Sequence, residues 1–429
     1  MNPSPSLHLV SSLSTRRQLL AALSGALALS ATRGLASTVT ATGKTPRILV
    51  RSSWQTVNIG DIGHTPGLLS LLAEHLPEVE VTLWPASIKD GVEEILRRNF
   101  PKVQIAQSAE EVKRAFADCD FFLHGSGASL VAEKQLAQWH KETGKPYGIY
   151  GITLGTVSAQ GKDLLSQAKF VFFRDSVSLQ FAKDHGITCP RMAFGPDAAF
   201  GVKLRNDAAA EAFLQAHQLE IGKFLCVIPR LRYTPYWLIR HKEMTDEDRH
   251  KHARNEEMKE HDHAPFREAI IAVARQTDLK ILVCPEDESQ VAIGKVMLVD
   301  PLPADVKAKV VWRDHYWLTD EALSTYVRSA GLFGLEMHSP IMCIGNGVPA
   351  LVGRFKEQTS KGLMWRDIGL GDWLFDMDEP ADVARLAPTV LKLAQDPIGS
   401  KAKAAQALEV VHAKQKETMQ ALRGALTHT

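Results

Sequence analysis

Glu336 and His338 are the residues of this 429-residue chain whose types and spacing point most directly to acid–base chemistry. They follow an apolar stretch from Gly331 that predicts a buried strand, and they precede a short helix predicted from Pro340. The last polar side chains of such a strand lie at the edge of a parallel sheet where α/β proteins bind ligands. His338 can act there as a general acid or base beside Glu336. The alternative is a strand-end histidine bonded to backbone.

Two further groups of residues offer positive charge for an anionic ligand. Arg230 and Arg232 follow an apolar run and alternate, which in a strand would place both on one face, where they could bind a carboxylate or phosphate. A role in surface ion pairs is the alternative. Arg174 also ends an apolar run, and Arg174-Asp175 can equally stabilise a turn through local hydrogen bonds.

The segment NIGDIGHTPG predicts an anion-binding turn. The backbone N–H groups of Asn58, Gly60 and Asp61 would face a ligand at the start of the following helix. Pro66 suits the first turn of that helix. Asp61 is a candidate catalytic residue beside His338 and Glu336, and it can equally be a helix cap or turn residue. His64 belongs to the same segment and is a candidate ligand-binding residue.

A second glycine-rich turn, Gly125-Ser126-Gly127, follows the apolar strand DFFLH. Its glycines let backbone approach either a ligand or a helix closely. Asp197, in the segment GPDAAF, closes the first half of the chain and is a further candidate for ligand binding.

Apolar runs alternate with amphipathic segments along the chain, as expected for doubly wound parallel sheets. The predicted fold class is α/β, with two Rossmann-like domains facing each other across a cleft. The predicted parts are an export leader (1–36), an N-terminal domain (46–205), a C-terminal domain (215–396) and a terminal helix (397–429). Strand ends from both domains should bring together Asn58, Asp61, His64, Ser126, Arg174, Asp197, Arg230, Arg232, Glu286, His315 and His338.

The composition is that of a globular protein without a nucleic-acid footprint. The formal net charge is +1, with 45% hydrophobic and 23% charged residues and no long basic run. The five cysteines have no metal-ligand or disulfide spacing, and we assign neither a cofactor nor a metal to the candidate site.

The first forty residues have the layout of a twin-arginine export signal. Arg16-Arg17 precedes a short apolar run, and a small-x-Ala site, Gly34-Leu35-Ala36, follows it. The run is too short to span a bilayer comfortably, so we expect removal and no stable membrane span afterwards. The predicted location is periplasmic or otherwise exported, and cytoplasmic if the leader is not a signal.

Residues 241–263 are dense in His, Asp and Glu and predict a solvated, mobile insertion, such as a charged lid over the cleft. His261 and His263 leave a metal site open as an alternative.

Taken in order, several segments resemble the polysaccharide pyruvyl transferase family. NIGDIGHTPGLLSLL is similar to the family's opening asparagine-glycine-aspartate turn and helix, and DFFLHGSGASL to its strand and glycine triplet. FVFFRDSVSLQFAKDHGI resembles its arginine-aspartate-serine segment, and GPDAAF the aspartate-x-x-phenylalanine after it. The resemblance runs from about Arg47 to Leu351.

The resemblance implies a fold similar to the glycosyltransferase B type and transfer of the carboxyethylidene group of phosphoenolpyruvate to two hydroxyls of a glycan acceptor. Such chemistry needs cations for a carboxylate and a phosphate, an acid that protonates the vinyl carbon, and a base for the hydroxyl proton. Trp237, Trp312, Trp317 and Tyr236 can stack on a sugar ring, with core packing as the alternative.

The family's arginine-leucine-histidine motif reads Glu336-Met337-His338 here. The histidine is retained, but a carboxylate replaces the arginine and would repel an anionic donor. Export would also separate the enzyme from phosphoenolpyruvate, a cytoplasmic metabolite. Two alternatives therefore stay open: a glycan-active enzyme with another donor, in which Glu336 is catalytic, and an exported glycan-binding protein without turnover.

Overall fold

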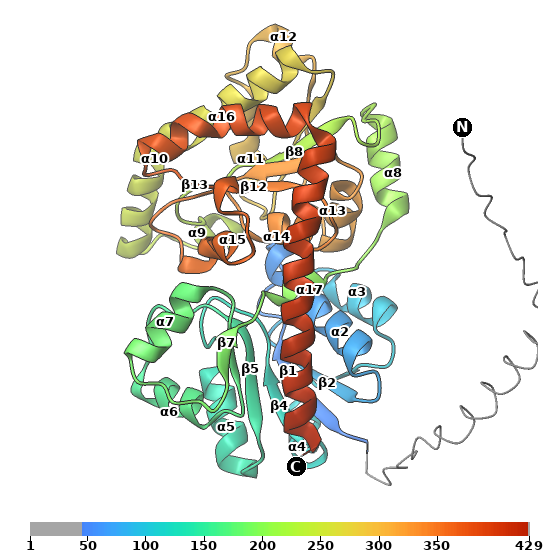
Figure 1. Cartoon of the computed structure of the whole chain (residues 1–429), viewed down its shortest axis with the longest axis vertical. Helices are drawn as coiled ribbons and strands as arrows, with labels where there is room; N and C mark the ends of the chain where they lie inside the picture. Colours follow the sequence, from blue (N-terminus) through green and yellow to red (C-terminus); the bar gives the residue numbers. More distant parts are fainter. Residues whose placement is uncertain (1–44, 428–429) are drawn as a thin grey trace, which may run out of the picture. The chain divides into compact units, whose positions relative to one another are not determined.

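The structure is a computed structural model that describes residues 45–427 and contains two parallel β-sheets with helices on both faces (Figure 1). The predicted leader, residues 1–36, lies outside the described residues. The first sheet consists of β1 (Arg47–Ser52), β2 (Glu80–Pro85), β3 (Gln104–Ile105), β4 (Phe121–His124), β5 (Tyr147–Ile152), β6 (Val171–Phe173) and β7 (Met192–Phe194). The second consists of β8 (Phe224–Ile228), β9 (Lys280–Val283), β10 (Val310–Trp312), β11 (Gly331–Gly334), β12 (Ala350–Arg354) and β13 (Leu374–Asp376).

Both sheets are doubly wound. The strand order is β3-β2-β1-β4-β5-β6-β7 in the first sheet and β10-β9-β8-β11-β12-β13 in the second. All neighbouring strands are parallel, and the order reverses between β1 and β4 and between β8 and β11. In such sheets ligands bind beyond the carboxyl ends of the strands at the reversal. The predicted α/β class with two Rossmann-like domains is confirmed.

The connections between strands are mostly helical. The helices are α2 (Ile59–His75), α3 (Val92–Asn99), α4 (Ala109–Asp118), α5 (Glu133–Thr143), α6 (Ala159–Gln167), α7 (Ser176–Asp184), α8 (Asp207–Ala216), α9 (Tyr236–Ile239), α10 (Asp246–Gln276), α11 (Gln290–Ile293), α12 (Ala304–Lys307), α13 (Thr319–Tyr326), α14 (His338–Ile344), α15 (Met364–Asp367), α16 (Pro380–Gln395) and α17 (Pro397–Thr427). Shorter or irregular turns are η1 (Ala198–Gly201), η2 (Gly294–Val299), η3 (Ser360–Leu363) and η4 (Gly371–Trp373).

Apolar clusters fill both faces of each sheet. One cluster lies between the first sheet and α2, another between that sheet and α4 to α6, and a third fills the second domain. Strands such as β1 and β8 are buried along almost their whole length because helices cover both faces, which explains their continuous apolar runs.

Helix α2 is buried on nearly all sides because it contacts both domains. It packs on the first sheet and also contacts η1, α13, α14 and α17. Its first turn is thereby placed beside the start of α14, so residues from the two domains can form one site.

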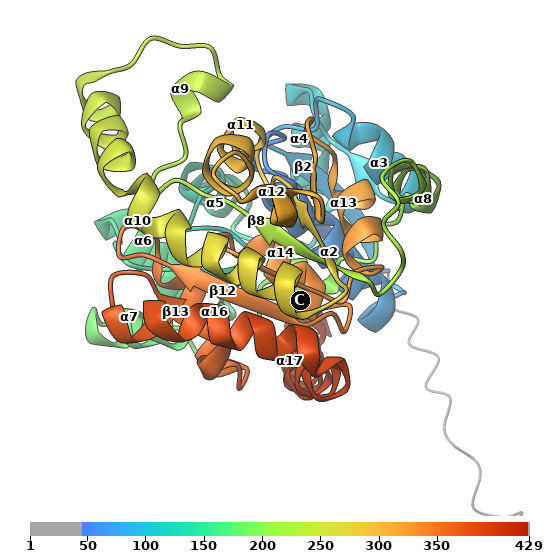
Figure 2. The ribbon, with the colours of Figure 1, turned by 90° about the horizontal axis from the view of Figure 1, so that it is seen from above.

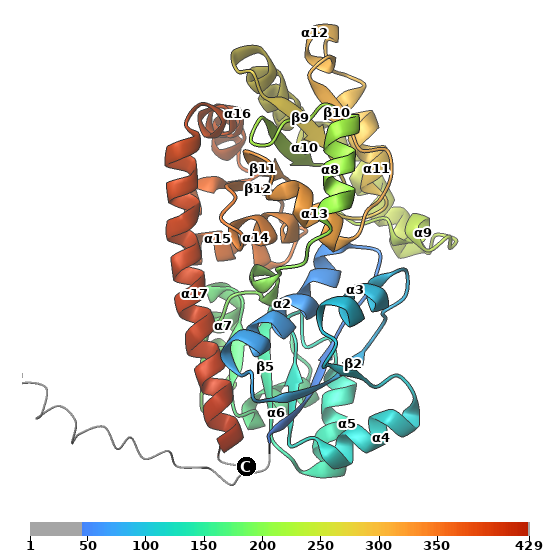
Figure 3. The same cartoon turned by 90° about the vertical axis from the view of Figure 1, so that its right-hand side faces the viewer.

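The terminal helix α17 crosses from the second domain to the first, where Met419 and Leu422 join the core against the first sheet (Figures 1 and 3). At its other end it follows α16, which lies alongside α10 (Figure 2). Within residues 45–427, no helix combines the length and apolarity that crossing a membrane requires.

Two local predictions are wrong. Pro66 is not in a first helical turn, because α2 begins seven residues earlier at Ile59, where Asn58 provides a side-chain cap. The charged segment is not a separate insertion either: from Asp246 it forms the first half of the 31-residue helix α10. A Thr245 capping box begins that helix, and its charged residues form pairs along the exposed side.

Candidate active site

The carboxyl ends of the two sheets meet at a pocket of about 230 Å³. The first domain contributes the start of α2, which follows β1. The second contributes the loops after β8, β11 and β12. The pocket is lined by Asn58, Asp61, His64, Ala128, Arg174, Arg230, Thr234, Tyr236, Glu336, Met337, His338, Glu357, Gln358, Thr359, Lys361 and Gly362.

A larger hollow of about 840 Å³ lies at the opposite edge of the first sheet, near the starts of β1 and β2. Its lining includes Arg47, Glu80 and Lys102. Open α/β sheets bind ligands at the carboxyl ends of strands, so the smaller pocket is the better candidate site.

The backbone N–H groups at the start of α2 already donate hydrogen bonds to acceptors within the protein. The Asn58 side chain accepts hydrogen bonds from the N–H groups of Gly60 and Asp61 at 2.8 and 3.1 Å. The N–H of Ile59 donates to the carbonyl of Glu286 at 2.9 Å. These donors therefore have protein partners, and the anion-binding turn expected at this position is not formed. The cap is Asn58 and not Asp61.

A buried chain of polar groups starts at His64. Its Nδ1 lies 3.0 Å from a carboxylate oxygen of Asp197, whose other oxygen accepts a 2.6 Å hydrogen bond from Arg174. Arg174 also donates to the Thr153 hydroxyl at 2.7 Å. Burial alone would raise the pKa of the Asp197 carboxyl, but His64 and Arg174 outweigh burial and hold that pKa well below its usual range. Asp61 lies one helical turn before His64, with its carboxylate 3.8 Å from His64 Nε2.

His338 is the first residue of α14 and packs directly on α2. A Cβ atom added at Gly60 would lie 2.1 Å from the His338 Cβ, so this approach requires glycine. His338 Nδ1 lies 3.3 Å from the carboxylate of Glu286, which also accepts 2.7 Å hydrogen bonds from the backbone and hydroxyl of Ser339. Its Nε2 lies 3.2 Å from the amine of Lys361.

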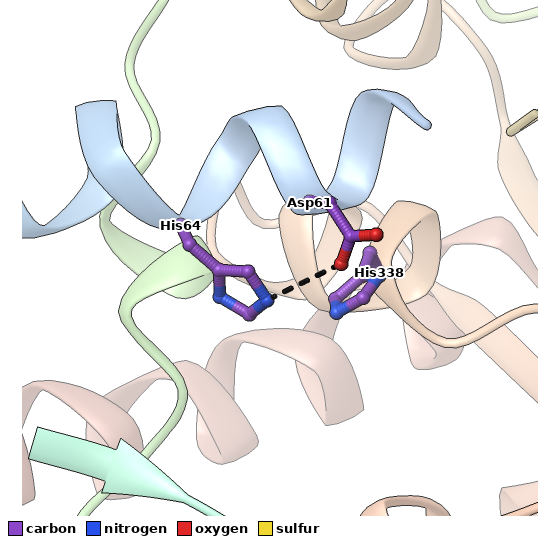
Figure 4. Close-up of side chains that lie close together, drawn as sticks. All are labelled: Asp61, His64 and His338. Atoms are coloured by element: carbon purple, nitrogen blue, oxygen red, sulfur yellow. Dashed lines mark ion pairs between the residues drawn. The ribbon is translucent and has the colours of Figure 1, made fainter. Parts of the chain in front are cut away.

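The His64 and His338 side chains lie next to each other (Figure 4). Their rings form an edge-to-face pair with centroids 4.8 Å apart. Burial, helped by nearby Lys361 and His64, holds the pKa of His338 well below its usual value, so its imidazole is neutral at neutral pH. Burial likewise lowers the pKa of Lys361 to about 8, with Arg174 contributing.

Glu336 is paired with Arg230. The guanidinium donates to one carboxylate oxygen at 2.5 Å, and the Gln290 side chain donates to the other at 2.7 Å. Burial raises the pKa of Glu336 to about 7 against the opposing effect of Arg230, and burial also raises the pKa of neighbouring Asp287 to about 7. The Glu336 carboxylate is thus bound to an arginine of the same pocket.

Arg232 does not reach the pocket. Its side chain is buried and donates to Asp262 at 2.9 Å through two nitrogens and to Glu357 at 2.9 Å. Asp378 lies 2.7 Å away. The expected shared face of Arg230 and Arg232 depends on a strand, but β8 ends at Ile228, so side-chain alternation does not apply to them.

The Gly125-Ser126-Gly127 turn supports the pocket from behind. The Ser126 hydroxyl accepts a 2.8 Å hydrogen bond from the N–H of Ala198, next to Asp197. A Cβ at Gly125 would meet the Ser52 side chain at 2.8 Å, so this glycine permits close packing within the first domain.

Most predicted site residues converge. Asn58, Asp61, His64, Arg174, Arg230, Glu336 and His338 line the pocket, and Gly60, Asp197 and Glu286 support them. His315 is exposed and pairs with Asp314. Of the proposed stacking residues only Tyr236 lines the pocket. Lys361, in η3 beyond β12, also lines the pocket, and no sequence motif around it marks it as a site residue.

A sequence profile described as polysaccharide pyruvyl transferase matches residues 58–352. No curated protein sequence matches the chain.

Solved structures with similar folds share little sequence with the chain. A putative UDP-N-acetylglucosamine 2-epimerase from Listeria monocytogenes has a TM-score of 0.55 at 11% identity, covering 90% of this chain and 98% of its own. HepE from Anabaena, in complex with UDP and glucose, has a TM-score of 0.53 at 11% identity, with 90% and 100% covered. UGT2 from Phytolacca americana has a TM-score of 0.52 at 11% identity, with 89% and 100% covered. These similarities support a fold of the glycosyltransferase B type.

Proposed function

The chain belongs to the polysaccharide pyruvyl transferase family, and on this basis we propose that it transfers a pyruvyl group from phosphoenolpyruvate to two hydroxyls of a glycan. An acid adds a proton to C3 of the donor, and C2 becomes the electrophile. The two glycan oxygens form bonds to C2 as the bond between C2 and the phosphate oxygen breaks. The hydroxyls release two protons: one replaces the proton given to C3, and the other leaves with phosphate.

The placement of His338 carries this proposal. The histidine of the family's motif lies at the head of α14, inside the pocket where strand ends of both domains meet. Glu286 orients its imidazole, and Gly60 allows α2 to contact it. A buried side chain held from two directions is suited to act on a substrate in a defined position.

The pocket also offers cations for the donor. Arg174, Arg230 and Lys361 line it and come from three different segments of the chain. A carboxylate and a phosphate on one small molecule need such a set of N–H donors. A volume of about 230 Å³ suits a small donor, while the glycan would bind at the mouth.

Tyr236 is the candidate contact for the glycan. It lines the pocket, is 37% exposed, and accepts a 3.1 Å hydrogen bond from Gln55 on its hydroxyl. An exposed aromatic ring at the mouth of a site can stack on the apolar face of a sugar.

The pair of Glu336 and Arg230 favours a second candidate, a glycan-active transferase with a different donor. Arg230 is partly neutralised by this pair, as Arg174 is by Asp197, and both pairs weaken the attraction for a trianionic donor. The predicted leader supports the same candidate, because an exported protein would not meet phosphoenolpyruvate. Fusing the first 45 residues to a reporter and fractionating the cells tests export. Lys replacement of Arg16 and Arg17 should retain the reporter in the cytoplasm if the leader is a twin-arginine signal.

The direct test is turnover. The full-length protein is incubated with phosphoenolpyruvate and a panel of glycans, and we expect glycan-dependent phosphate release with conversion of the donor's vinyl protons to a ketal methyl signal in NMR spectra. His338→Ala should abolish the reaction, whereas His315→Ala, at an exposed position outside the pocket, should not. Glycan modification from another donor would support the second candidate, and glycan binding without any turnover would contradict both.

A further inference from the structure

We propose that Asp61, His64 and His338 form a binding site for a divalent transition-metal ion. Each offers one ligand atom, a carboxylate oxygen or an imidazole nitrogen, and these atoms lie within 4.8 Å of one another. Ligand atoms around one ion lie roughly 3 to 4 Å apart at bond lengths of about 2.1 Å, so small side-chain rotations would close the site. Within residues 45–427, no other three His, Cys, Asp or Glu side chains meet in this way.

The backbone holds the three side chains in place. Asp61 and His64 are three residues apart on α2 and so project from one face of that helix. His338 approaches from the head of α14, and the three side chains point toward one another (Figure 4). The contact between α14 and Gly60 fixes the distance between the two helices.

Each of the two histidines contacts a buried carboxylate through Nδ1, as metal-binding histidines usually do. His64 Nδ1 contacts the buried Asp197 carboxylate at 3.0 Å, and His338 Nδ1 contacts the buried Glu286 carboxylate at 3.3 Å. A carboxylate on one ring nitrogen orients the ring and leaves the other nitrogen for a metal. His64 Nε2 lies 3.8 Å from Asp61, which is too long for a hydrogen bond between them. If the two histidines only provided hydrogen-bond partners for buried carboxylates, their rings would not both need to lie near Asp61.

The charges around the pocket also favour a cation. Apart from Glu357, whose carboxylate is paired with Arg232 and Arg254, five carboxylates lie in or directly behind the pocket, but only three lysine or arginine side chains do. The carboxylates are Asp61, Asp197, Glu286, Asp287 and Glu336, and the cations are Arg174, Arg230 and Lys361. A buried excess of carboxyl groups is unfavourable unless they are protonated, paired or bound to a metal, and a divalent ion would offset this excess.

Lys361 would compete with the ion. Its amine lies 3.2 Å from His338 Nε2, the nitrogen that Glu286 leaves for a metal. Lysine has a flexible stem, so the ammonium group can withdraw when an ion binds, but its charge would oppose binding. Removing that charge should therefore strengthen metal binding, an effect that no purely structural role of Lys361 predicts.

The ligand set indicates the kind of metal. Two imidazoles and one carboxylate suit zinc, manganese, iron or cobalt rather than calcium or magnesium, which prefer oxygen ligands. Three protein ligands leave coordination positions open, as in catalytic metal sites. The ion would supply positive charge where Glu336 replaces the family's arginine, but the proposal does not depend on pyruvyl transfer.

The test is metal content and affinity of the full-length protein. Protein stripped with a chelator is reconstituted with Zn²⁺ and, separately, Co²⁺. We expect one tightly bound ion per chain and cobalt absorption bands typical of nitrogen and oxygen ligands. His64→Gln and His338→Gln should each lose the ion. Asp197→Asn and Glu286→Gln should weaken affinity by about 10- to 100-fold through the outer hydrogen bonds.

Two further variants test whether the ion binds at the proposed site and not elsewhere on the protein. His261→Ala removes an exposed histidine of the charged part of α10 and should leave stoichiometry and affinity unchanged. Lys361→Met should bind the ion more tightly than the natural protein, and this variant decides the question if the glutamine variants fail to fold. The proposal is overturned if stripped protein takes up no tightly bound ion, or if folded His64→Gln and His338→Gln still bind it. Metal binding without pyruvyl transfer would overturn only the proposed function.

Discussion

The Arg230 guanidinium donates a 2.5 Å hydrogen bond to the carboxylate of Glu336, across 106 residues of sequence. Glu336 is buried, whereas the Arg230 side chain keeps 19% of its surface exposed. The pair therefore joins the loops after β8 and β11 at the point where strand order reverses in the second sheet. The charge expected to repel an anionic donor is thus offset by an arginine of the same pocket.

Glu336→Ala should lower the free energy of unfolding by about 3 kcal/mol, because it leaves a largely buried guanidinium without its partner. Replacing both residues with Met should recover most of that loss. Equilibrium unfolding in urea measures both effects. Glu93→Ala is the matched control: it breaks the exposed pair with Arg97 and should cost only about 0.3–0.5 kcal/mol. A loss as small as the control's for Glu336→Ala would contradict the importance of the pair.

Two glycines of α2 make a matched pair of variants. A Cβ at Gly60 would lie 2.1 Å from the His338 Cβ, whereas a Cβ at Gly63 meets nothing closer than the Met342 sulfur at 3.4 Å. Gly60→Ala should therefore separate α2 from α14, cost about 1–3 kcal/mol and weaken metal binding. Gly63→Ala should be neutral or stabilise the protein by up to about 1 kcal/mol through helix propensity. Equal effects of the two substitutions, in stability and Zn²⁺ affinity, would contradict the close packing.

The sequence predicts the two sheets well because buried parallel strands consist of continuous apolar runs, and amphipathic helices separate these runs. It also predicts that Asp61, His64 and His338 lie at strand ends. The two-domain fold predicts that they come together, but sequence spacing does not predict that their ligand atoms lie within 4.8 Å of one another, because packing between α2 and α14 sets that distance.

The errors have identifiable causes. Pro66 pointed to a later helix start, but the Asn58 cap and the tertiary contacts of α2 place the start at Ile59. Arg230 and Arg232 lie beyond the end of β8, so the side-chain alternation expected of a strand does not hold for them. Lys361 reaches His338 across 23 residues, and no local pattern reports such a contact.

We expect Arg232 to stabilise the fold and not to bind a ligand. Its buried guanidinium joins Asp262, Glu357 and Asp378, so Arg232→Met would leave three carboxylates without their shared partner and should cost about 3–5 kcal/mol. Arg232→Lys should restore only part of this loss, because one ammonium group cannot reproduce the planar set of donors. Thermal unfolding measures the losses, and Zn²⁺ affinity of the folded protein should be unchanged. A variant with natural stability and altered ligand binding would instead place Arg232 in the site.

The ion pairs of Arg232 also predict how the free energy of unfolding changes at acidic pH. Burial would raise the pKa of Asp378, but the backbone N–H of Lys356 and the Arg232 side chain outweigh burial and lower it below its usual value near 3.8. The unfolded chain then binds a proton at a higher pH than the folded chain does. The stabilisation by ionised Asp378 is complete above about pH 5 and is lost as the pH falls through the lowered pKa. Asp378→Asn removes this contribution, so unfolding free energies measured from pH 6 to pH 3 should show natural and variant proteins converging toward the acid end. A constant difference across that range would show that the folded protein does not favour the ionised carboxylate.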